Sequence, residues 1–152
     1  MAAGTWKVYA RAKKHIGAGN ISLLGVIRMQ LHRASASAEL ANLSALEGSP
    51  SVPAEISARG GYAALGRTLP SVSWTAGASA KQMRFSYASS GIIFTASGSA
   101  LNDIKYALLR NSLSAGGGYA LCYCTLSSSE FTIAAGNTLT IAPASTGVFT
   151  LT

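Results

Sequence analysis

The acidic and histidine side chains that could do acid–base chemistry are few and scattered. The 152-residue chain has two histidines, His15 and His32. Its carboxylates are Glu39, Glu47, Glu55, Asp103 and Glu130. General acid–base catalysis needs paired carboxylates, or a histidine held beside a carboxylate. No Asp-x-Asp or Glu-x-x-His spacing occurs, and two distant histidines lack a third metal ligand. We therefore expect solvated or capping carboxylates, no acid–base centre and no metal site.

Nucleophiles and phosphate-binding loops are equally poorly supported. Serines are abundant, but no Gly-x-Ser-x-Gly motif positions one for attack. The Gly17-Ala18-Gly19 run lacks the third glycine and the preceding strand of a dinucleotide-binding loop. Cys122 and Cys124 are two apart on a predicted strand, so they share a face and do not close a disulfide readily. We expect buried, reduced cysteines, no cofactor and no enzymatic activity.

The positive charge is concentrated at the N-terminal end. The formal net charge is +7, although only 11% of residues are charged, against about 25% in an average soluble domain. Residues 1–38 contain no acidic residue. Their basic residues are Lys7, Arg11, Lys13, Lys14, Arg28 and Arg33. This asymmetry indicates either a contact with a negatively charged partner or a solvated basic face.

A short helix is predicted in this basic region, over Thr5–Ile16, followed by a turn at residues 17–20. Thr5 suits the N-cap position, and the alanine-rich and lysine-rich sequence has good helix propensity. The apolar stripe consists of Val8, Tyr9, Ala12 and Ile16. Lys7, Arg11 and Lys14 share the opposite side. Residues 1–20 are thus expected to form a basic helix and turn.

The rest of the chain has the period of β-strands. In Val26–Arg33 apolar residues alternate with Arg28, Gln30 and His32, which predicts one solvated face. Residues 34–61 show no regular period, so we predict a long irregular loop there, with a helical turn over Glu39–Leu46. The further predicted strands are Arg67–Thr75, Lys81–Ala88, Ile92–Thr95, Ile104–Arg110, Tyr119–Leu126, Glu130–Ala134, Thr138–Ala142 and Val148–Leu151. The pattern indicates an all-β, jelly-roll-like β-sandwich of about eight to nine short strands with a short N-terminal helix, in a single domain over 1–152.

Several short segments along the whole chain carry a family resemblance. They are Trp6-Lys7-Val8-Tyr9, Gly60-Gly61-Tyr62, Leu69-x-x-Val72-Ser73-Trp74-Thr75, Phe94-Thr95-Ala96-Ser97-Gly98, Leu121-Cys122-Tyr123, Gly136-Asn137-Thr138-Leu139-Thr140-Ile141 and Gly147-Val148-Phe149-Thr150-Leu151. With these segments the sequence resembles a family of small virion structural proteins of tailed bacteriophages, and is similar to capsid cement or decoration proteins. The resemblance implies a location in the virion and no catalytic role.

The resemblance also implies partners. These are the phage major capsid protein and other copies of the same chain on the shell. The candidate capsid-contact residues are Trp6, Lys7, Arg11, Lys13 and Lys14. The Ser35–Gly60 loop is a candidate second surface, and packing of Trp6 in the core is the alternative to its contact role.

Three other functions remain to be compared with capsid binding. Another virion position, such as a head–tail joint, a tail or a fibre base, would use the same β scaffold. A carbohydrate-binding jelly-roll module would need exposed aromatic residues. Nucleic-acid binding would need Trp6 and Tyr9 to stack on bases beside the cations, but the basic residues are few.

No apolar run is long enough for a membrane span. We expect neither a nucleic-acid partner nor a membrane.

Overall fold

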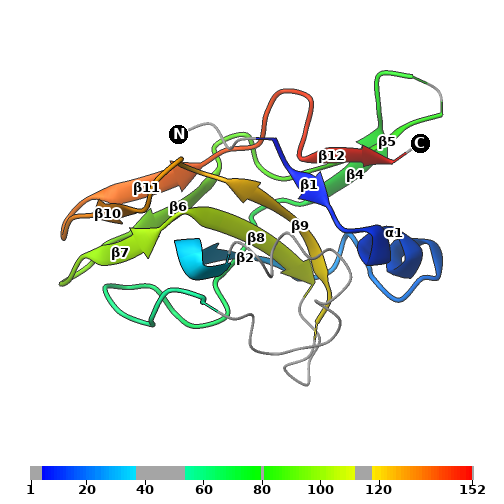
Figure 1. Ribbon diagram of the computed structural model, residues 1–152. Helices are drawn as coiled ribbons and strands as arrows, with labels where there is room; N and C mark the ends of the chain where they lie inside the picture. Colours follow the sequence, from blue (N-terminus) through cyan, green and yellow to red (C-terminus); the bar gives the residue numbers. More distant parts are fainter. Residues whose placement is uncertain (1–4, 37–53, 80, 112–117, 152) are drawn as a thin grey trace.

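The computed structural model is mostly β-structure with one short α-helix (Figure 1). It describes residues 5–36, 54–79, 81–111 and 118–151. The elements are β1 (Lys7–Val8), α1 (Ala10–Gly17), β2 (Ile27–His32), the 3₁₀-helix η1 (Ala34–Ala36), β3 (Arg67–Thr68), β4 (Ser73–Ala76), β5 (Met83–Ser86), β6 (Ile92–Thr95), β7 (Leu101–Ile104), β8 (Tyr106–Asn111), β9 (Ala120–Thr125), β10 (Phe131–Ile133), β11 (Thr138–Ile141) and β12 (Phe149–Leu151). The predicted all-β, sandwich-like class with one short helix is confirmed, while jelly-roll connectivity stays a prediction.

A five-stranded antiparallel sheet with the order β1-β9-β8-β2-β3 forms the centre of the structure. Met29 and Leu31 of β2 pair with Leu109 and Ala107 of β8, and all four side chains are buried. The smaller antiparallel sheets are β10-β7, β11-β6 and β12-β5-β4. In Figure 1 the β6, β7, β10 and β11 strands gather on the left, and β4, β5 and β12 lie at the upper right. Buried side chains from all of these sheets join one apolar core.

The prediction that β2 has a solvated face is wrong. Gln30 and His32 are fully buried. The strand lies inside the sheet, between β8 on one side and β3 on the other. Beyond β3, residues 54–56 continue the pairing, since the Arg33 amide donates to Ala54 O (3.0 Å) and the Ile56 amide to Leu31 O (3.0 Å). These neighbours pair with the backbone of β2, and the Glu55 side chain that Gln30 contacts helps to cover the face. An alternating pattern marks a solvated face only when nothing covers that face.

The predicted helix over Thr5–Ile16 begins too early. Residues 7–8 form edge strand β1, in which Lys7 lies opposite Tyr123 and Val8 opposite Cys122. The Tyr9 amide donates to Leu121 O at 3.0 Å, and Tyr9 is the N-cap of α1 without a side-chain capping bond. Thr5 is therefore not the cap. Pairing with β9 satisfies the backbone of residues 7–9 and outweighs their helix propensity, which is a weak preference.

One predicted strand is divided in two, and one observed strand was not predicted. Residues 67–75 contain β3 and β4, with Ser71 between them in the left-handed region (φ 46°). The predicted strand Ile104–Arg110 corresponds to β8, which pairs with β2 and β9. The missed strand is β7, which precedes β8 and pairs with β10. Asp103 has φ 62°, so the chain changes direction where it passes from one sheet to the next. The Glu39–Leu46 turn lies outside the described residues.

Candidate functional site

The N-terminal segment is held firmly against the central sheet. Beyond the β1–β9 pairing, Ala12 of α1 is buried, and the buried Tyr9 ring lies 5.7 Å from that of Tyr123. At the other end of α1, the His15 ring stacks on Tyr119, with centroids 4.2 Å apart and planes inclined by 24°. Contacts at both ends therefore fix the position of this short helix, which would be marginal as an isolated peptide.

Four predicted contact residues lie exposed on this fixed segment. Lys7 belongs to β1, and Arg11, Lys13 and Lys14 to α1. We call these four side chains the N-terminal basic surface. The Lys7 ammonium lies 5.7 Å from the centroid of the Tyr123 ring, a cation–π distance. Lys14 lies in the last helical turn, where the helix dipole favours a cation.

Trp6 does not share this exposure. Its relative accessibility is 9%, and its side chain belongs to the apolar core. Trp6 Nε1 has no hydrogen-bond partner among the described residues. The structure thus places Trp6 in core packing, the alternative role considered for it.

The remaining cations of the N-terminal quarter lie elsewhere. Arg28 is on β2, opposite Arg110 of β8 and Thr68 of β3. Arg33 follows β2; its Nη2 donates to Ser57 Oγ at 3.1 Å, and its Nε lies 3.9 Å from Asp103 Oδ2. The charge that is continuous in sequence is therefore divided in space, and only four cations form the N-terminal basic surface.

A partly buried polar cluster, centred on the half-buried Glu55, was missed by the sequence analysis, which predicted a solvated or capping carboxylate. The Tyr62 hydroxyl donates to Glu55 Oε1 at 2.6 Å and accepts from the Leu31 amide at 3.1 Å. Gln30 Nε2 donates to Glu55 Oε2 at 3.4 Å. Burial raises the pKa of Glu55, while the Tyr62 hydrogen bond and, less strongly, the Arg110 charge oppose the rise. The cluster fastens residues 55–62 to β2. No local spacing signals it, because its members meet only through tertiary pairing.

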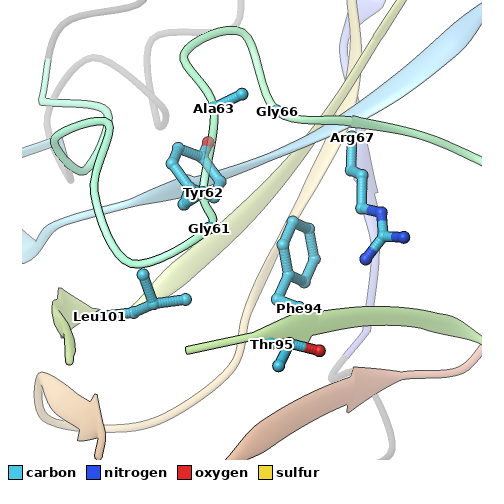
Figure 2. Close-up of a pocket in the computed structure, with 8 residues that line it drawn as sticks. All are labelled: Gly61, Tyr62, Ala63, Gly66, Arg67, Phe94, Thr95 and Leu101. Atoms are coloured by element: carbon cyan, nitrogen blue, oxygen red, sulfur yellow. The ribbon is translucent and has the colours of Figure 1, made fainter. Parts of the chain in front are cut away.

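Two hollows share Arg67. The smaller, about 90 Å³, lies between residues 61–67 and β6, where the Tyr62 and Phe94 rings face each other with centroids 5.9 Å apart (Figure 2). Arg67 Nη1 donates to Ile93 O beside it. The second hollow, about 240 Å³, continues past Arg67 along Thr68, Pro70 and residues 90–93. Both volumes lie below the range of about 300–1,000 Å³ of most small-molecule sites.

The two cysteines, Cys122 and Cys124, are free and buried, as predicted. The described part of the chain contains no group of three or more histidine, cysteine or acidic residues that could hold a metal. Within the same residues, no helix is long and apolar enough to cross a membrane.

Comparisons with known proteins add no family. No family model, curated protein or solved structure matches the chain.

Proposed function

We propose that the protein is a capsid cement protein of a tailed bacteriophage. It binds the major capsid protein through the N-terminal basic surface and bridges neighbouring capsid subunits, together with other copies of itself on the shell. The observation that carries this proposal is the set of four exposed cations on a short segment fixed to a β scaffold. The sequence resemblance to phage virion proteins supplies the identity of the partner.

Rigidity makes this basic surface suitable for docking. A helix fixed at both ends loses little backbone freedom on binding, so less free energy is spent on ordering it. The charges steer association with a negatively charged surface and set its salt dependence. Each solvated charge contributes little on its own, typically about 0–1 kcal/mol. Repetition of the contact across a shell compensates, because several modest contacts together give strong avidity.

The alternatives from other functional classes have weaker structural support. Tyr87 and Tyr123 are buried, and Trp74 is half-buried with its ring 6.3 Å from that of Phe149. These aromatic residues are not free to line a sugar-binding groove. Trp6 and Tyr9 are also buried, so neither ring is available to stack on a nucleic-acid base.

A different virion position is the second candidate. A head–tail joint, a tail or a fibre base could use the same basic surface against another acidic subunit. Copy number in purified particles separates these possibilities, since a cement protein decorates the whole shell whereas a joint or tail component is present in one small ring.

The test is addition of the purified protein to heads of the encoding phage from which the protein is absent. We expect saturable binding that weakens with salt, and loss of most binding in the double variant Lys13→Glu/Lys14→Glu. The matched control is Arg59→Glu/Lys81→Glu, which changes the net charge equally at exposed sites outside α1. Equal binding by the two variants would overturn the role of the N-terminal basic surface.

A further inference from the structure

The loop between α1 and β2 exposes two large apolar side chains. The relative accessibilities of Leu24 and Val26 are 67% and 49%, above those of the other exposed large apolar residues of the described chain. Single exposed apolar residues are common on protein surfaces. Two of them in one short loop, separated only by Gly25 and following a basic helix, form a distinct feature that the proposed function does not yet use.

Hydrogen bonds fix this loop to the end of α1. The Gly19 amide donates to Ile16 O at 3.1 Å and the Asn20 amide to His15 O at 2.9 Å. Gly19 has φ 75°, the left-handed conformation that closes a Schellman motif. The Gly25 amide then donates to Ser22 O at 3.1 Å, which closes a turn around Leu24.

Alternating burial orients the exposed pair. Ile21 and Leu23 are buried in the core, at 4% and 6% accessibility, whereas Leu24 and Val26 are exposed. The exposed pair is therefore held between two anchors, since Leu23 precedes Leu24 and the fully buried Ile27 follows Val26. The loop wraps around the C-terminal end of α1, the end that carries Lys14 (Figure 1). The apolar pair and the N-terminal basic surface thus occur on one continuous structural unit.

We propose that Leu24 and Val26 form an apolar anchor that inserts into a depression of the same acidic protein surface that the N-terminal basic surface binds. The inference rests on the proposed function and extends it. A side chain contributes most to binding in a well-packed, desolvated pocket whose surrounding contacts exclude water. In this arrangement the cations set the rate of encounter, and the apolar pair sets the lifetime of the complex.

The chemistry of the unit favours a protein over a lipid surface as its partner. Two apolar side chains on a closed turn bury too little area for stable membrane anchoring, which needs a longer apolar face or a second lipid anchor. They match the size of one pocket on a folded protein. The acid-free sequence around them, from Thr5 to Arg33, requires that pocket to have an acidic rim.

The experiment measures dissociation from the same heads lacking the protein, for the double variant Leu24→Ser/Val26→Ser. We expect dissociation about tenfold faster than wild type, with the slope of affinity against salt unchanged. Ile93→Ser is the control, because Ile93 is similarly exposed (46%) on β6, which lies on the opposite side of Figure 1 from α1. We expect wild-type dissociation from this control.

The outcomes separate the two proposals. Wild-type dissociation by Leu24→Ser/Val26→Ser, with charge variants still impaired, overturns the apolar anchor and leaves the proposed function standing. No binding by the wild-type protein overturns both. A parallel arm uses vesicles containing phosphatidylglycerol: binding there that the serine variant loses would assign the apolar pair to a membrane and overturn the inference. Circular dichroism of each variant confirms that the loss is not unfolding.

Discussion

Replacing Tyr62 by Phe should destabilise the protein more than the same change at other buried tyrosines. The Tyr62 hydroxyl makes two hydrogen bonds, one from the buried Leu31 amide and one to the Glu55 carboxylate. Removing it leaves a buried amide unsatisfied, which costs about 1–3 kcal/mol. It also removes a hydrogen bond to a charged acceptor, worth about 1.5–3 kcal/mol. Because the two losses overlap, we expect a net decrease of about 2–4 kcal/mol in the free energy of unfolding.

Two other tyrosines are matched controls for this change. The Tyr87 hydroxyl donates one neutral hydrogen bond, to Ile141 O at 2.9 Å, so Tyr87→Phe should cost about 1 kcal/mol. The Tyr9 hydroxyl is buried without a hydrogen-bond partner among the described residues. Tyr9→Phe should therefore be neutral or stabilising, because it removes a polar atom whose burial is uncompensated. All three changes delete the same atom from a buried ring.

Equilibrium urea unfolding measures the three free energies, with an unchanged m-value as the sign that only stability has changed. Acid provides a second readout. As Glu55 becomes protonated it is no longer a charged acceptor, so the deficit of Tyr62→Phe should shrink as the pH falls through the raised pKa of Glu55. A Tyr62→Phe loss no larger than that of Tyr87→Phe would refute the Glu55 cluster as a fastening point.

Three further predictions concern the same fold. Burial raises the pKa of Glu55 above 4.5, so the folded state binds its proton more tightly, and stability should fall as the pH rises from 4.5 through the raised value. Glu55→Gln should abolish that fall in urea titrations across pH, and an unchanged profile would contradict it. Gly66→Ala should lower the free energy of unfolding by about 2–4 kcal/mol more than Gly98→Ala, as measured by thermal unfolding. Both glycines have φ above 70°, so the backbone strain is the same, but a Cβ at Gly66 would lie 2.0 Å from Met29 O whereas one at Gly98 would meet nothing. Burial raises the pKa of both cysteines, to about 12 at Cys124. A thiol reagent should therefore modify neither cysteine until urea unfolds the chain. Rapid labelling of the native protein would contradict their burial.

The sequence predicted the parts of the fold that local pattern determines. The Ile92–Thr95 strand has the predicted bounds, because a short apolar run lies between turn-forming residues on both sides. The burial of Cys122 and Cys124 on β9 was also predicted, because free cysteines are among the most buried residue types. The all-β class with one short basic helix depended only on such local signals.

What the sequence did not predict depends on distant partners. The first turn expected for the helix became β1, because β9 offers Lys7 and Val8 a free edge that no local pattern reveals. Gln30 is buried because Glu55 and Tyr62 reach β2 from a segment far along the chain. For the candidate site, the four cations are exposed and their contact role stays a prediction, whereas Trp6 is buried in the core.

The most direct test of the central claim is the salt dependence of binding to heads that lack the protein. The logarithm of affinity should fall as the logarithm of salt concentration rises, and the slope should be markedly shallower for Lys13→Glu/Lys14→Glu than for the equally charged control Arg59→Glu/Lys81→Glu. Binding that is indifferent to salt and equal in the two variants would contradict an electrostatic contact through β1 and α1.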